Sequence, residues 1–104
     1  MLVVITTTPG FAEGEILAEQ LVEARLAACV QIIPQITSVY VWEGKIEKET
    51  EQLLLIKTSE EKYAEVEDLI RKLHTYEVPE IVAIDPARVS EPYRSWLEST
   101  LRNE

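Results

Sequence analysis

The sequence predicts an α+β fold: a ferredoxin-like βαββαβ sandwich with a long protruding β-hairpin and an extra C-terminal helix. Strand-like and helix-like segments alternate along the chain, a tight turn joins two long strand-like runs near the middle, and the last segment has amphipathic helical spacing. Two right-handed crossovers joined by a hairpin form one antiparallel sheet with helices on one face. The 104 residues suffice for a single domain, residues 1–104, and are too few for two.

The first strand is expected over residues 2–6, a run rich in β-branched side chains that ends before the turn signal Thr8-Pro9-Gly10. A helix should follow, because early glutamates favour the positive end of a helix dipole. Apolar residues then recur at a spacing of three to four, which is typical of a helix with one buried face. These residues are Ile16, Leu17, Leu21, Ala24 and Ala28.

The second strand is expected over residues 29–42, with a kink at Pro34, because proline cannot donate to a sheet ladder. A tight turn at residues 43–45 leads into a return strand that ends at Thr58. The return strand begins polar, but residues 53–56 are continuously apolar and should be covered on both sides. The base of the hairpin therefore lies in a core and its tip lies outside it. One parity of the outgoing strand carries Val30, Ile32, Ile36, Ser38, Tyr40 and Trp42.

The second half of the chain repeats the pattern of helix and strand. Ser59 is expected to cap a helix that ends near His74. Residues 75–79 should be irregular, because a residue that precedes proline avoids the helical region. The fourth strand is expected over residues 81–84, and Ser90-Glu91-Pro92 starts the last helix.

The charge balance argues against two classes of partner. Ten Lys and Arg residues stand against nineteen Asp and Glu, which gives a net charge of -9 at pH 7. This sign repels the phosphates of nucleic acids and the surface of an anionic membrane, so we expect neither as a partner. One cysteine cannot form an internal disulfide, and no long apolar run or signal-like segment is evident. We therefore expect a cytoplasmic location.

The hairpin tip carries apolar and aromatic side chains beyond the reach of the two crossover helices. Tyr40 and Trp42 lie there, next to Val39 and Val41. Exposed apolar side chains on an open-edged strand favour pairing with another chain, so we expect a symmetric oligomer. The alternative is that the last helix folds back over the tip. The glutamates at positions 43, 47, 49 and 51 alternate in strand fashion and are interpreted as a solvated face or an ion-paired ribbon between subunits.

Cys29 and His74 are the single thiol and the single imidazole of the chain, and both sit at the ends of expected elements. The topology could bring them together, and sulfur with imidazole suits copper or zinc. Two ligands are too few for a closed tetrahedral site, and no C-x-x-C or H-E-x-x-H spacing is present. Three interpretations stay open: purely structural roles, a weak metal site, and a nucleophilic Cys/His pair.

Two further charged features are candidates for chemistry. Lys57 ends an otherwise apolar strand, where a cation pairs with a carboxylate or faces an anion bound between subunits. Glu77 and Glu80 flank Pro79 and could form an acid/base couple, although nothing in the sequence supplies an apolar pocket to separate their pKa values.

Several motifs, in order, resemble the CutA divalent-cation tolerance family from the first strand to the last helix. They are Leu26-Ala27-Ala28-Cys29-Val30, Ile33-Pro34, Thr37-Ser38-Val39-Tyr40-Val41-Trp42-Glu43-Gly44-Lys45, Ile56-Lys57-Thr58, Leu73-His74-Thr75-Tyr76-Glu77-Val78-Pro79-Glu80-Ile81, and Tyr93 with Trp96-Leu97.

The resemblance implies a cytoplasmic homotrimer with an architecture similar to the PII signalling proteins, no enzymatic activity and no obligatory cofactor. It also implies a link to copper and other divalent cations, with Cys29 and His74 at the family's cysteine and histidine positions. Thr75 stands where the family usually has proline, and Gln35 where it usually has glycine. Thr6 and Leu73 stand where some metal-linked members have a further cysteine and histidine, so we expect metal binding to be weak if it occurs.

A second functional hypothesis is a PII-like sensor. In that case clefts between the subunits of the trimer would hold a small anionic metabolite against Lys57 and the Trp42 ring, with Tyr40 nearby. A third is a small-molecule enzyme that uses Cys29 and His74.

Overall fold

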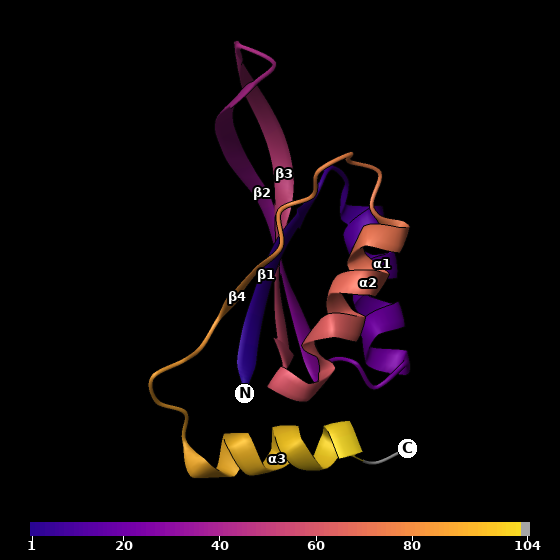
Figure 1. Cartoon of the computed structure of the whole chain (residues 1–104), viewed down its shortest axis with the longest axis vertical. Helices are drawn as coiled ribbons and strands as arrows, with labels where there is room; N and C mark the ends of the chain where they lie inside the picture. The colour runs from indigo at the N-terminus through magenta and orange to yellow at the C-terminus, as the bar shows by residue number, and fades with distance from the viewer. Residues whose placement is uncertain (103–104) are drawn as a thin grey trace.

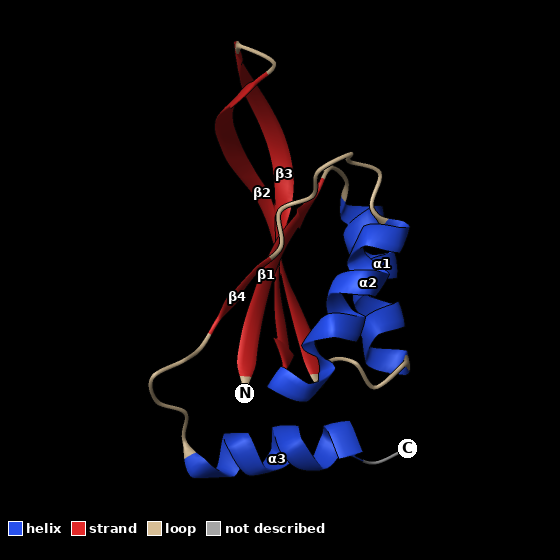
Figure 2. Ribbon diagram, in the orientation of Figure 1, coloured by secondary structure: helices blue, strands red, loops and turns tan. Residues whose placement is uncertain are grey.

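The computed structural model, which describes residues 1–102, contains one four-stranded antiparallel sheet with the strand order β2-β3-β1-β4 (Figure 1). The helices α1 and α2 cover one face of this sheet, and α3 lies across the end at which β1 begins (Figure 2). The α+β, ferredoxin-like prediction is therefore confirmed. The strands are β1 (Leu2–Thr8), β2 (Cys29–Trp42), β3 (Lys45–Thr58) and β4 (Val82–Ile84); the helices are α1 (Phe11–Glu23), α2 (Tyr63–Leu73) and α3 (Glu91–Arg102).

Two helix boundaries differ from the predictions for local reasons. The helix α1 ends at Glu23 rather than continuing to Ala28, because Arg25 adopts a left-handed φ of 59° and the Leu26 N–H returns to the Leu21 carbonyl. Ala28 lies instead just before β2. A 3₁₀ turn, Glu60–Lys62, precedes α2, and the Ser59 side chain forms no capping hydrogen bond.

The main core lies between α1, α2 and the face of the sheet that they cover. Its fully buried members include Val4 and Leu54 from the sheet, with Leu21 from α1 and Ile70 from α2. Leu53 and Leu55 point to the other face of the sheet and are only half-buried. The expectation that residues 53–56 are covered on both sides is therefore met on one side only within a single chain.

The last helix covers the end of the sheet and not the hairpin tip. Leu97 and Leu101 of α3 form a second buried cluster with Ala28, against which Met1 packs. Figure 1 shows the hairpin tip and α3 at opposite ends of the molecule. The alternative in which the last helix covers the tip is therefore wrong, and the tip stays exposed in one chain.

The hairpin has a two-residue turn and a bulge, as its turn and proline signals indicate. Glu43 and Gly44 connect the strands with φ values of 51° and 79°, and Trp42 lies opposite Lys45. At the predicted kink, Pro34 and Gln35 together face Gln52, because the register shifts between Ile33 and Ile36. The Gln35 N–H donates to the Gln52 side-chain oxygen over 3.1 Å, which replaces the ladder bond lost at the bulge.

The bulge also reverses the side of the sheet on which the later side chains lie. Before it, Val30 pairs with Ile56 on the helix-covered face; after it, Ile36 pairs with Glu51, which points the other way. The set from Val30 to Trp42, which has one parity along the sequence, is therefore divided between two faces at the predicted kink. Beyond the bulge one face of the hairpin carries Val39, Val41 and Ile46, and the other carries Ser38, Tyr40, Trp42, Glu47 and Glu49.

The irregular segment after α2 is held against the sheet by a set of hydrogen bonds that we term the latch, formed by Thr7, Glu51, His74 and Tyr76. The His74 ring contacts the Thr7 carbonyl through Nε2 at 2.6 Å, and the Tyr76 N–H donates to His74 Nδ1 at 3.0 Å. The Glu51 carboxylate, only 6% exposed, accepts hydrogen bonds from the Tyr76 hydroxyl at 2.8 Å and the Thr7 hydroxyl at 3.2 Å. The latch therefore fixes residues 74–76 to β1 and β3.

The Glu43 backbone offers a first test of the hairpin. Its left-handed φ disfavours glutamate, whereas Asn-Gly is the preferred pair for such a turn. Replacing Glu43 by Asn should therefore raise the free energy of unfolding by about 0.5–1 kcal/mol, as measured by urea unfolding at fixed protein concentration. Glu43→Gln removes the same charge without relieving the backbone and should bring no gain. An equal gain in both variants would contradict this explanation.

The latch generates a prediction at alkaline pH. Burial, and then the hydrogen bond to Glu51, raise the pKa of the Tyr76 phenol above its ordinary value. A phenol whose pKa is higher in the folded state stabilises the protein fully below about pH 10 and loses this contribution as pH rises toward the folded value. Tyr76→Phe should therefore lower stability at neutral pH by about 1–2 kcal/mol, and its stability should fall less steeply than that of the wild type above about pH 10.

Thr7→Val is the matched control for this experiment, because it removes the other hydrogen bond to Glu51 but keeps the phenol. Its unfolding free energy should retain the steep alkaline decline. Parallel profiles for Tyr76→Phe and the wild type would show that Tyr76 does not cause the decline.

Candidate functional site

The structure does not bring Cys29 and His74 together within one chain. Cys29 is half-buried at the start of β2, opposite Lys57, which in turn pairs with Val3 near the beginning of β1. His74 contacts Thr7 near the other end of β1. Val3 and Thr7 are four residues apart on β1, which places Cys29 and His74 roughly 13 Å apart along the strand direction. The expectation that the start of the second strand and the end of the second helix approach each other is wrong for a single chain.

The His74 ring has both of its nitrogens engaged. A backbone N–H can only donate, so Nδ1 accepts from Tyr76 and the ring proton must lie on Nε2, which donates to the Thr7 carbonyl. A metal ion would have to displace one of these bonds. Within residues 1–102 no group of three or more His, Cys, Asp and Glu side chains could hold a metal ion. The donors of one chain therefore do not fit a closed metal site.

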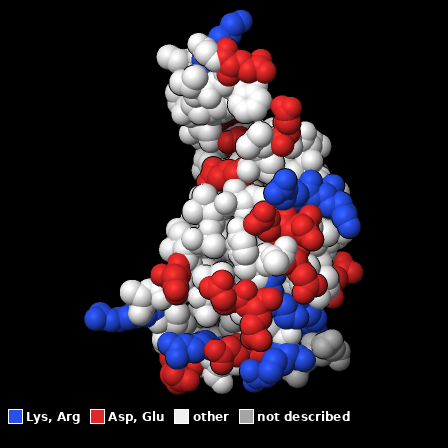
Figure 3. Space-filling model, in the orientation of Figure 1, with Lys and Arg blue, Asp and Glu red and all other residues white. Residues whose placement is uncertain are grey.

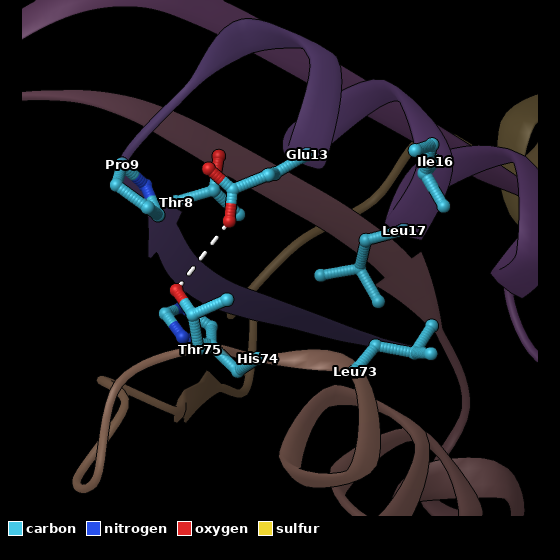
Figure 4. Close-up of a pocket in the computed structure, with 8 residues that line it drawn as sticks. All are labelled: Thr8, Pro9, Glu13, Ile16, Leu17, Leu73, His74 and Thr75. Atoms are coloured by element: carbon cyan, nitrogen blue, oxygen red, sulfur yellow. Dashed lines mark hydrogen bonds between the residues drawn. The ribbon is translucent and has the colours of Figure 1, made fainter.

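The pocket next to His74 is small and largely apolar. It holds about 180 Å³ between the start of α1 and the end of α2 (Figure 4). Ile16, Leu17 and Leu73 line it, and the Thr75 hydroxyl closes one side by donating to Glu13 over 3.4 Å. This volume is below the range of ligand pockets, so we assign no ligand to it.

Lys57 contacts an aromatic side chain rather than a carboxylate. Its Nζ lies 3.4 Å from the Tyr93 hydroxyl and 5.5 Å from the centre of the Tyr93 ring, and it forms no ion pair with any residue in the described range 1–102. Trp42 lies opposite Lys45 at the far end of β3, about twelve residues away, or roughly 40 Å along the strand. One chain therefore cannot present Lys57 and Trp42 to the same small anion.

A groove of about 820 Å³ lies where the hairpin leaves the body of the protein, and we call it the acidic groove. One wall is the hairpin face with Tyr40 and Trp42; the other is the segment of residues 75–80, which passes beside the base of the hairpin (Figure 1). Acidic side chains gather where the hairpin joins the body of the protein (Figure 3). The lining residues are Thr7, Ser38, Val39, Tyr40, Trp42, Glu47, Glu49, Glu51, Thr75, Tyr76, Glu77, Val78 and Glu80.

The acidic groove has five carboxylates and no lysine or arginine among these lining residues. Burial, followed by the negative charges of Glu49, Glu51 and Glu47, raises the pKa of the Tyr40 phenol. Glu77 and Glu80, which the sequence offered as an acid/base couple, are exposed on the rim. The groove is therefore negatively charged with aromatic walls, which suits a cation better than an anion.

Sequence reasoning found the members of the acidic groove but not the groove itself. It interpreted the alternating glutamates as a solvated face, and it did not single out Tyr76 as a partner of Glu51. The two-residue turn carried a usable signal. It sets Trp42 opposite Lys45, so Glu47 lies opposite Tyr40 and Glu49 opposite Ser38. Glu47 and Glu49 therefore share a face with Tyr40 and Trp42. The latch has no comparable signal, because Tyr76 and Glu51 meet only through the tertiary fold.

No helix within residues 1–102 is both long enough and apolar enough to span a membrane.

Comparisons with known proteins agree with the fold and its order of elements. The family model described as "CutA1 divalent ion tolerance protein" matches residues 2–100. A divalent-cation tolerance protein CutA from Thermus thermophilus is 42% identical over 95 residues, which cover 91% of this chain and 92% of that protein. A solved structure titled as the periplasmic divalent cation tolerance protein CutA from Archaeoglobus fulgidus has a TM-score of 0.94 at 40% identity, covering 98% of this chain and all of that one.

The relatives differ in length and in the compartment that their names state. The chloroplastic CutA of Arabidopsis thaliana is 40% identical over 102 residues, 98% of this chain, but the chain spans only 56% of that protein. Because the names of these relatives state chloroplastic and periplasmic locations, the cytoplasmic location of this chain stays a prediction. Since the family model matches almost every residue from the first strand to the last helix, the chain belongs to the CutA1 divalent ion tolerance protein family.

Proposed function

We propose that this CutA protein is a non-enzymatic homotrimer of the cytoplasm that serves the divalent-cation, and in particular copper, response, and that it binds the metal only weakly. The observation that carries the proposal is the uncovered apolar face of the hairpin. Val39, Val41 and Ile46 are 62%, 68% and 78% exposed and lie on the face of the hairpin opposite Tyr40 and Trp42. Exposed apolar strands of this length favour association with another chain.

The open face of the sheet supports self-association as well. Ile33, Val82 and Ile84 are exposed there, next to the half-buried Leu53 and Leu55. A closed symmetric oligomer would cover this face and the hairpin tip with the same operation. The number three comes from the resemblance to the CutA family.

The absence of an enzymatic role is supported by the geometry of the two candidate nucleophilic partners. Cys29 faces Lys57, while the His74 ring is bound to two backbone groups. A nucleophile needs a base within hydrogen-bond reach. We therefore propose no catalytic residue and no obligatory cofactor.

Weak metal binding is supported by the same geometry. Copper would bind His74 only after displacing the Tyr76 N–H or the Thr7 carbonyl, and Cys29 lies beside a positive charge. The missing donors would come from another chain or from carboxylates. Competition with existing hydrogen bonds should keep the affinity low.

A PII-like sensor for a small anionic metabolite is the second candidate. It is favoured by Lys57, a half-buried cation without a carboxylate partner among residues 1–102. The ligand would lie between subunits, because the groove next to Trp42 carries negative charge. A thermal-shift screen of anionic metabolites tests it: stabilisation that Lys57→Ala abolishes would favour this candidate.

The assembly can be tested by sedimentation and light scattering at micromolar concentration. The wild type should have three times the chain mass of 11.9 kDa. Ile46→Asp places a charge on the apolar hairpin face and should shift the mass toward one chain, while each chain keeps its fold because Ile46 is exposed. Ile16→Asp, on the exposed side of α1, is the matched control and should leave the mass unchanged. A monomeric wild type would refute the trimer.

The metal role can be tested by calorimetric titration with copper. Cys29→Ser and His74→Ala should each weaken the binding roughly ten-fold or more, because each removes a preferred donor. Tyr76→Phe loosens the same segment as His74→Ala without removing a donor nitrogen, so it serves as the control. Unaltered titrations in both donor variants would mean that copper binds elsewhere or not at all.

A further inference from the structure

The outer side of the two crossover helices carries a short apolar groove, which we call the helix groove and which Glu13, Ile16, Leu17, Leu73 and Thr75 line. It is the pocket of about 180 Å³ between the start of α1 and the end of α2 (Figure 4). The buried Leu17 forms its floor, while Ile16 and Leu73 lie on either side of its opening and are 53% and 38% exposed. Two large aliphatic side chains on neighbouring helices therefore face water across an apolar depression.

The helix groove has a carboxylate at one end and neither lysine nor arginine among its lining residues. Glu13 accepts a long hydrogen bond of 3.4 Å from Thr75 and forms no ion pair within the described residues 1–102. The helix α1 carries four glutamates and no cation. Arg71 and Lys72 end α2 outside the groove, and Arg71 already pairs with Glu67. This charge distribution favours a partner that brings a cation to Glu13.

The size of the helix groove fits one side chain and not a separate ligand. Sites for organic molecules begin at about 300 Å³. An apolar cavity of about 150 Å³, however, admits a group as large as benzene. The groove therefore suits a single apolar side chain that is attached to a larger molecule, which is how grooves between helices recognise peptides.

The helix groove lies on the side of the molecule that the proposed self-association leaves free. The surfaces proposed for association are the apolar hairpin face and the open face of the sheet. The helices α1 and α2 cover the opposite face of that sheet (Figure 2). A partner can therefore reach the groove in a single chain and in a trimer alike, and this inference depends neither on the number of chains nor on copper.

We propose that the helix groove docks a helical segment of another protein, which places a leucine, isoleucine or methionine side chain against Leu17 and an arginine or lysine on Glu13. Glu13 and Leu17 are one turn apart on α1. Side chains one turn apart on the partner helix are separated by the same distance, about 5–6 Å, so an apolar anchor and a cation at that spacing match the two positions. A helix laid between α1 and α2 also covers Ile16 and Leu73.

The probe is a synthetic peptide of alanine and glutamine, about sixteen residues long so that it is helical in water, with one leucine and an arginine four positions away. Replacing the leucine by alanine should weaken binding to the full chain roughly ten-fold or more. Replacing the arginine by glutamine should weaken it roughly two- to five-fold. In ¹H–¹⁵N titrations the amides of residues 13–17 and 73–75 should shift, and the indole N–H of Trp42 should not.

Three results of these titrations would overturn the proposal. They are the absence of binding at millimolar peptide, equal binding of the three peptides, and shifts confined to the hairpin.

Matched variants of the protein test the apolar and the charged contact separately. Ile16→Asp should weaken peptide binding roughly ten-fold or more, whereas Val22→Asp, at an exposed position of α1 outside the groove, should not. Glu13→Gln keeps an acceptor for Thr75 and should weaken binding of the arginine peptide roughly two- to five-fold, with Glu15→Gln as the control. The peptide with glutamine in place of arginine should bind Glu13→Gln and the wild type equally. Unchanged binding to Ile16→Asp, or equal losses in both aspartate variants, would overturn the proposal.

The same variants separate this inference from the proposed function. Ile16→Asp should lose the peptide and keep the mass of the assembly, whereas Ile46→Asp should lose the assembly and keep the peptide. Loss of the peptide in Ile46→Asp would show that the site needs a neighbouring chain, which would overturn the proposal. A mass above that of the trimer that grows with concentration and disappears in Ile16→Asp would show that a second copy of this chain occupies the groove, and would overturn it too.

Discussion

The pairing of β2 with β3 is the constraint on which the rest of the structure depends, and its decisive point is the bulge at Pro34 and Gln35 opposite Gln52. Below the bulge, Val30 and Ile56 face the helices and belong to the core. Above it, the parity is reversed, so Tyr40 and Trp42 share a face with Glu47 and Glu49. One extra residue thus separates a core-forming half of the hairpin from a half that forms surfaces.

The latch lies next to this bulge. Glu51 lies opposite Ile36, just on the hairpin-tip side of the bulge, and its parity along β3 places it on the same face of the sheet as Leu53 and Leu55. The Tyr76 hydroxyl donates a hydrogen bond to the buried Glu51 carboxylate, and the Tyr76 backbone N–H donates to Nδ1 of the His74 ring. The same network that shapes the acidic groove therefore removes His74 from the set of free metal donors in a single chain.

Local patterns predicted what depends on local geometry. The element order, the Glu43-Gly44 turn and the kink at Pro34 follow from proline, glycine and hydrophobic period, and the structure confirms them. The change of face of the β2 side chains beyond Pro34 could not be predicted in the same way. A proline indicates a bulge, but it does not tell how many residues of the partner strand lie opposite the bulged residues. The latch joins positions that are far apart in the chain, and the wrong expectation for Cys29 and His74 came from reasoning on element ends without strand register.

Charge connects the acidic groove to the assembly. Each chain has a net charge of -9, so bringing chains together raises the electrostatic free energy of the complex. The hairpin separates the two opposing demands: its apolar face lowers the free energy of association, while the carboxylates lie on the opposite face.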